Sequence, residues 1–132
     1  MTTLAITGLY ASLLSFLIIV LGARISHMRM KYRVGLLDGG HPQLTHAIRV
    51  HGNAVEWVPL VLILFACAES QHLPYWALHL LGITLIMSRL LHAWGVSHSS
   101  GKSFGRFYGI MSTWLIILIL GIYNLYAFIM TR

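Results

Sequence analysis

The chain has 132 residues, of which 58% are hydrophobic and only 9% are charged, and its mean hydropathy is +0.78. These values exclude an ordinary soluble domain and make lipid the natural solvent for the chain. The net charge of +6 does not indicate a nucleic-acid partner, because the Lys and Arg residues flank apolar segments, as the positive-inside pattern of membrane proteins requires.

Four apolar segments are long enough to cross a bilayer, which needs roughly 20 residues each. The predicted spans cover residues 4–23, 44–68, 75–94 and 107–130. They leave too little chain for a soluble domain, so we predict one domain over residues 1–132, an all-α membrane protein built as a four-helix transmembrane bundle. The first span has no basic segment before it and no convincing cleavage site, so we expect it to be retained.

The predicted loops differ in charge. The first loop is expected to begin at Arg24 and to end in a turn over residues 37–42, and the third includes Gly95, Lys102 and Arg106. Together these two loops hold six Lys or Arg residues, whereas the second loop holds none. We therefore expect loops 1 and 3 to be cytoplasmic, in the inner (plasma) membrane if the protein is bacterial.

Polar residues gather on two of the predicted spans. At 100° per residue, Arg49, Asn53 and Glu56 share one stripe of the second span, and Arg89 and His92 share a face of the third. Charged groups at membrane depth cost several kcal/mol unless they pair or meet water. We therefore predict that the two stripes face each other or line a polar pocket in the cytoplasmic leaflet.

The residue types of this pocket favour a small anionic ligand that also carries a cationic group. Guanidinium groups hold carboxylates through two hydrogen bonds, and Glu56 could accept from an ammonium group. An alternative remains open, in which Glu56 only neutralises Arg49 or Arg89 in an ion pair that orients the helices.

Other polar residues have simpler interpretations. The eight histidines show no metal-ligand spacing, so no metal site is expected. His51 could form a hydrogen bond across helices as readily as contact a ligand, and we expect His79 and Cys67 to pack against neighbouring helices. Loop cations such as Arg29 have membrane lipid headgroups as their default partners.

The run from Arg49 to Pro59, RVHGNAVEWVP, resembles the signature of the MAPEG superfamily, the membrane-associated proteins in eicosanoid and glutathione metabolism. The resemblance extends to residues 29–34 and 89–95 and is closest to short bacterial members. It implies a homotrimer that binds glutathione as co-substrate between subunits, with a hydrophobic small-molecule electrophile arriving from the bilayer. It assigns glutathione contacts to Arg29, Arg49, Asn53, Glu56 and Arg89, and we add His92 because it shares the face of Arg89.

The resemblance also implies a catalytic residue. Arg106 resembles the arginine that helps to activate the glutathione thiol in active members, and a guanidinium beside sulfur favours the nucleophilic thiolate. The sequence departs from those members at Val96, where several have a tyrosine, and at Ala47, where some have an arginine.

Three functions are compatible with these residues. The leading hypothesis is a membrane glutathione transferase, with peroxidase activity as a variant, that conjugates glutathione thiolate to hydrophobic electrophiles in a detoxification role. The second is a non-catalytic glutathione- or lipid-binding membrane protein of the same superfamily. The third, a transport or proton-relay component, is disfavoured because the polar residues occupy only one leaflet.

Overall fold

The computed structural model describes residues 4–98 and 103–130, and within these ranges the regular secondary structure is entirely helical. The helices are α1 (Ala5–Tyr32), α2 (Pro42–Ser70), α3 (Tyr75–His98) and α4 (Phe104–Met130). Each is long and apolar enough to cross a membrane, α3 over Tyr75–Ser97. The predicted all-α protein with four membrane-spanning helices is thus confirmed for the described part of the chain.

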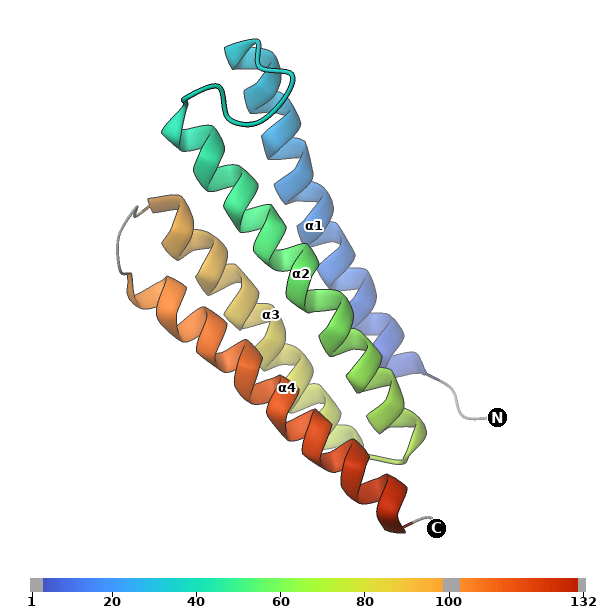
Figure 1. Cartoon of the computed structure of the whole chain (residues 1–132). Coiled ribbons are helices and arrows are strands. Elements are labelled where there is room, and N and C mark those ends of the chain that lie inside the picture. The colour runs from blue at the N-terminus through green and yellow to red at the C-terminus, as the bar shows by residue number, and fades with distance from the viewer. Residues whose placement is uncertain (1–3, 99–102, 131–132) are drawn as a thin grey trace.

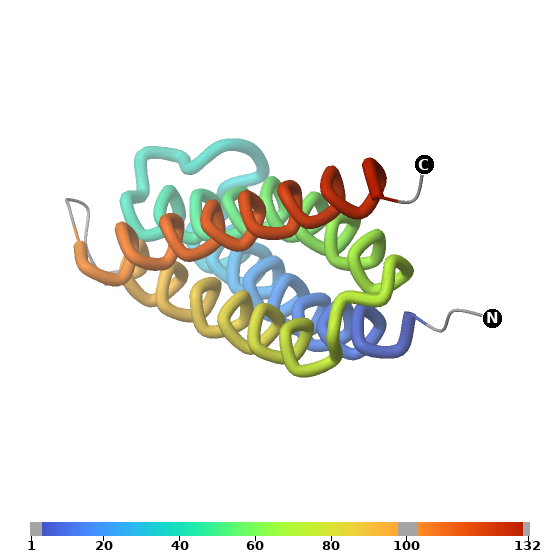
Figure 2. Tube along the Cα trace, turned by 90° about the horizontal axis from the view of Figure 1, so that it is seen from below, coloured from blue at the N-terminus to red at the C-terminus, as the bar shows by residue number. Residues whose placement is uncertain are grey.

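The helices form an elongated bundle (Figures 1 and 2), and its two ends differ in composition. The α1–α2 connection, the C-terminal end of α3 and the start of α4 lie at one end, which carries most of the cationic residues and is called the basic end below. The start of α1, the α2–α3 connection and the end of α4 lie at the other, called the terminal end.

Helix α2 packs against each of the other three helices, and α3 and α4 form the most extensive helix pair. Apolar side chains from all four helices meet along α2. The main buried cluster consists of Tyr10, Leu14, Val58, Val61, Phe65, Ala68, Leu78, Leu85, Ile116 and Leu120. This cluster occupies the middle and the terminal end, so the polar residues of the predicted site lie beyond it toward the basic end.

The helices extend farther than the predicted spans, which corrects several expected loop positions. Arg24, Arg29 and Lys31 belong to α1, Gly95 belongs to α3, and Arg106 lies in the first turn of α4. Hydropathy falls where charged residues begin, but Arg, Lys and Met are good helix formers, so the helix continues past the apolar segment. Lys102 lies outside the described residues.

The turn before α2 is organised by Asp38, as the breaker-rich segment predicts. Its carboxylate accepts hydrogen bonds from the Thr45 hydroxyl at 2.5 Å and from the backbone N–H of Gly40 at 3.0 Å. These two bonds hold the pKa of Asp38 below its usual value, and the bond from Thr45 has the larger effect. Pro42 then starts α2 at a position where its missing N–H costs nothing.

The polar groups of the terminal end bond to one another. Glu69, expected in a loop, is a buried residue of α2 whose carboxylate accepts the backbone N–H groups of Ile6 and Thr7 at 2.9 and 2.7 Å. It therefore caps the N-terminus of α1, where the helix dipole favours a negative charge. On the other side of α2, Gln71 donates to Asn124 of α4 at 2.8 Å.

Close approach of α3 and α4 depends on glycine. A Cβ built on Gly109 would lie 2.7 Å from the backbone oxygen of Ser88 and 2.7 Å from the Cβ of His92, so only glycine fits there. Small residues that let backbones approach are typical of helix pairs in membranes. The contact brings the carbonyl of Gly109 within reach of side chains on α3.

We predict that Gly109→Ala will separate α3 from α4 and lower thermal stability in detergent by about 1–3 kcal/mol, the usual cost of overpacking. Gly121→Ala is the matched control on the same helix, because a Cβ there meets nothing within 4 Å. Thermal unfolding of the two purified variants compares them. Equal melting temperatures would contradict the tight contact at Gly109.

Candidate functional site

The guanidinium of Arg89 connects three helices. Arg89 lies on α3 and is only 3% exposed. Its Nη1 donates to Oδ1 of Asn53 on α2 at 2.9 Å, and its Nη2 donates to the carbonyl of Gly109 on α4 at 2.8 Å. A rigid fork of donors suits this geometry, because two acceptors on different helices are held at once.

This bridge orients Asn53. The side-chain oxygen of Asn53 accepts from Arg89, so its amide nitrogen is left as a donor on a half-buried residue. Arg89 and Asn53 are thus in contact, as expected if the polar stripes of α2 and α3 face each other. His92 lies next to this bridge on α3 and is also buried, at 6% exposed, against the α4 backbone near Gly109.

The other two residues of the α2 stripe are exposed in the single chain. Arg49 and Glu56 both lie on the surface of α2, and Glu56 is midway between the two ends of that helix. Both belong to the described residues, and Glu56 lies within ion-pair distance of neither Arg49 nor Arg89 there. The alternative in which Glu56 neutralises one of these arginines is therefore not seen within the described part of one chain, and it stays a prediction.

The other two basic residues of the predicted site, Arg29 and Arg106, lie on α1 and α4. Arg29 is half-buried near the end of α1, and its Nη1 is fully buried without a hydrogen-bond partner among the described residues. Arg106 is exposed in the first turn of α4, where Ser103 accepts a hydrogen bond from its backbone N–H. Within the described part of the chain, therefore, neither guanidinium forms an ion pair.

A surface cavity adjoins Arg49 at the basic end. It has a volume of about 300 Å³ and is lined by Leu37, Asp38, Thr45, Ile48 and Arg49. The Asp38 carboxylate is already held by Thr45 and Gly40, so the guanidinium of Arg49 remains open to a ligand. Within residues 4–98 and 103–130, no group of three or more His, Cys, Asp or Glu residues could hold a metal ion.

Sequence reasoning missed the polar contacts of the terminal end. The predicted packing role of His79 omitted its hydrogen bond, in which Nδ1 of His79 lies 3.0 Å from the Tyr10 hydroxyl. Residues in these contacts are more than 50 positions apart, so no local spacing indicates them. One signal could have indicated these contacts: a carboxylate or amide next to an apolar span is costly to bury, so it needs a hydrogen-bond partner on another helix.

A family profile described as the MAPEG family matches residues 7–126. The chain belongs to the MAPEG family. The resemblance carried by residues 49–59 is thereby confirmed over nearly the whole chain. With its four membrane-length helices, this MAPEG chain is a multi-pass membrane protein.

Curated relatives of this MAPEG chain come from Escherichia coli. The inner membrane protein YecN of strain K12 is 36% identical over 121 residues, which cover 92% of this chain and 91% of the relative. The protein of the same name from an O6:H1 strain shows the same identity and coverage. The similarity therefore covers all four helices.

We predict that Arg89→Lys will destabilise this MAPEG protein by about 1.5–3 kcal/mol, the usual value of a hydrogen bond to a charged group. A single ammonium keeps the charge but cannot reproduce the fork that reaches both Asn53 and Gly109. Arg33→Lys, at the exposed end of α1, is the control and should change stability by no more than about 0.5 kcal/mol. Thermal unfolding in detergent measures both, and equal shifts would contradict the bridge.

Proposed function

We propose that this MAPEG protein is a membrane glutathione transferase, with peroxidase activity as a variant, that conjugates glutathione thiolate to hydrophobic electrophiles. One observation carries the proposal: Arg49 and Glu56 are exposed on a membrane helix, with Glu56 at its midpoint. Bare charges facing acyl chains cost several kcal/mol each, so a polar partner has to cover them. A second subunit and a charged ligand between the subunits supply that cover.

The chemistry of the stripe matches glutathione. The two carboxylates of glutathione suit the guanidinium groups of Arg49 and Arg29, and the ammonium group of glutathione suits the carboxylate of Glu56. The amide donor of Asn53, oriented by Arg89, suits a peptide carbonyl. Arg89 and His92 are buried in one chain, so they position the ligand-contacting side chains and do not contact the ligand themselves.

Arg106 is the residue that we assign to catalysis. Its exposed guanidinium lies at the N-terminal, positively polarised end of α4, where a thiolate is favoured over a thiol. With a chloronitrobenzene, the thiolate sulfur forms a bond to the ring carbon, chloride leaves, and the thiol proton passes to solvent. The remaining contribution to the rate of conjugation is proximity, because the bilayer concentrates the apolar electrophile beside the bound thiolate.

We place the protein in the inner membrane with the basic end cytoplasmic. The cationic residues of α1 and the start of α4 lie at that end, as the positive-inside rule requires. The name of the Escherichia coli relative as an inner membrane protein supports the same location.

We predict that Arg106→Ala will bind glutathione with nearly unchanged affinity but lose the thiolate, whereas Arg49→Ala will lose affinity. Purified protein is titrated with glutathione while the ultraviolet absorbance of the thiolate is recorded, and a chloronitrobenzene is then added. Loss of one guanidinium contact should weaken binding about tenfold or more. Full turnover by Arg106→Ala would contradict the role of that arginine, and absence of binding to the wild type would overturn the proposal.

A homotrimer is the second part of the proposal. Native mass spectrometry of the detergent-extracted protein is expected to give a mass three times that of the 14.8 kDa chain. Glutathione is expected to increase the fraction of intact assembly, because a ligand shared between subunits stabilises their association. A monomer that binds glutathione with full affinity would contradict a site between subunits.

A non-catalytic glutathione- or lipid-binding protein is the second candidate, and Val96 favours it. This residue, where several active family members have a tyrosine, is only 7% exposed and packs with Leu21, Val50 and Ala54. It therefore offers no hydroxyl to a substrate. Glutathione binding without thiolate or turnover in the titration above would select this function.

A further inference from the structure

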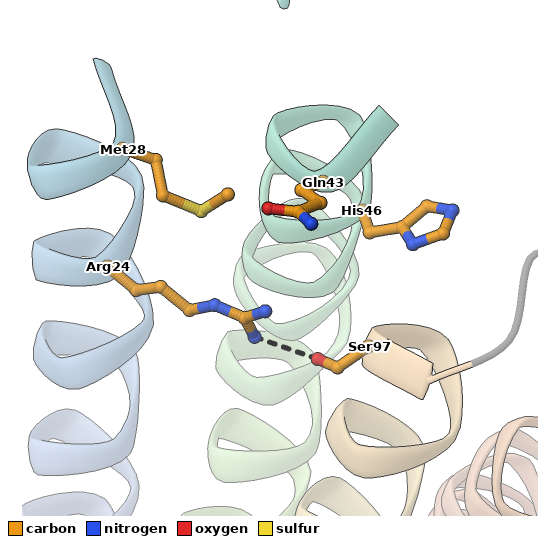
Figure 3. A pocket seen from close by; sticks show the side chains of 5 residues that line it. All are labelled: Arg24, Met28, Gln43, His46 and Ser97. Carbon is orange, nitrogen blue, oxygen red and sulfur yellow. Dashed lines mark hydrogen bonds between the residues drawn. The ribbon is translucent and has the colours of Figure 1, made fainter. Parts of the chain in front are cut away.

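A second cavity opens at the surface of the basic end, between α1, α2 and α3, and two of its lining residues, Arg24 and Gln43, are exposed (Figure 3). Its volume is about 300 Å³. It is lined by Arg24 and Met28 of α1, Gln43 and His46 of α2, and Ser97 of α3. The lining contains one permanent cation, one titratable imidazole and no carboxylate.

Arg24 crosses this cavity without meeting a negative charge. Its Nη1 donates to the hydroxyl of Ser97 at 2.8 Å, a neutral acceptor, as Figure 3 shows. Two of the three acidic residues of the chain bond elsewhere, Asp38 within its own turn and Glu69 at the terminal end, and Glu56 lies halfway down α2. The other N–H groups of Arg24 have no acceptor in the described part of the chain.

Gln43 presents a donor to the same space. The Tyr32 hydroxyl donates to its side-chain oxygen at 2.8 Å, and the Tyr32 ring is fixed by stacking on His41 at 4.1 Å. The amide nitrogen of Gln43 is therefore the group left to bond a ligand. Gln43 and His46 also lie in the first two turns of α2, the positively polarised end of that helix.

The depth of the cavity matches the phosphate level of a bilayer. Arg24 is 19 residues beyond Ala5, so about 30 Å of helix separates them, which equals the thickness of the hydrocarbon core. The cavity thus lies where α1 leaves the hydrocarbon, and Met28 supplies an apolar wall.

From these contacts we propose that the cavity binds the phosphate group of an anionic ligand. Arg24 holds it through its guanidinium, while Ser97, Gln43 and His46 donate from α3 and α2. A tetrahedral anion with several acceptor oxygens can use donors that converge from three helices. A membrane phospholipid headgroup and a free phosphate present the same chemistry.

This site is separate from the stripe proposed to bind glutathione. At 100° per residue, Gln43 points about 120° away from Arg49 and about 140° away from Glu56 around the axis of α2. His46 lies about 20° from Asn53 but about two helical turns closer to the basic end. The two cavities also share no lining residue. Occupation of one is therefore compatible with occupation of the other.

The test compares Arg24→Gln with Lys31→Gln, which removes the same charge from an exposed position of α1 outside the cavity. Thermal unfolding is followed in an uncharged detergent with inorganic phosphate, against chloride at equal ionic strength. In a second arm the additive is phosphatidylglycerol, against a diacylglycerol with the same acyl chains and no phosphate. Stabilisation by phosphate identifies a free anion, and stabilisation by phosphatidylglycerol alone identifies the lipid headgroup.

Wild type and Lys31→Gln should respond alike, whereas Arg24→Gln should need about tenfold more of the effective additive. Ser97→Ala, a small change that preserves the fold, should weaken the response severalfold and decides the matter if Arg24→Gln does not fold. Failure of both additives with the wild type, or equal loss in Arg24→Gln and Lys31→Gln, would overturn the proposal. Glutathione affinity of Arg24→Gln should equal that of the wild type, and its loss would overturn the separation of the two sites.

Discussion

A charged group held between three helices in a medium without water governs this structure. The guanidinium of Arg89 donates from Nη1 to Asn53 on α2 and from Nη2 to the Gly109 carbonyl on α4, while its buried Nε has no partner among the described residues. Because a buried cation without acceptors is costly in lipid, the helices have to adopt the register that provides both. Gly109 makes that register possible, since any larger residue would hold the α4 backbone away from α3.

The two ends of the bundle handle their polar groups in opposite ways. At the terminal end, Glu69 binds the first N–H groups of α1, and Gln71 binds Asn124. These contacts lie within one chain and serve its stability. From the basic end to the middle of α2, Arg49 and Glu56 are exposed, and a nitrogen of Arg29 is buried without a partner among the described residues. Groups that the fold leaves open in this way are the ones available to a ligand or a second subunit.

Much of this arrangement could be predicted from the sequence. Four apolar segments of membrane length define the architecture, and the stripe of Arg49, Asn53 and Glu56 follows from helical geometry alone. Helix ends could not be placed, because hydropathy reports where lipid ends, whereas α1 continues to Tyr32 beyond that point.

The direction of the stripe was equally hidden from the sequence. Helical angles show which residues share a face, but not whether that face meets a neighbouring helix or the outside of the subunit. Asn53 turned out to contact Arg89, while Glu56, within 60° of it around the helix, is exposed. Only the packing of α3 and α4 against α2 distinguishes these two positions.

Whether a residue of the stripe contacts a neighbouring helix or is exposed also determines what it can contribute to ligand binding. Asn53 is held in place before any ligand arrives, so its donor is preorganised and little conformational entropy is lost when it binds. Arg49 and Glu56 lack such support in one chain, and their partners have to come from outside it. In the assembly that we propose, ligand affinity and subunit association at this stripe would therefore be coupled, since each would supply acceptors or donors that the other leaves unpaired. Such coupling is stronger in lipid than in water, because no solvent is present to satisfy the unpaired groups.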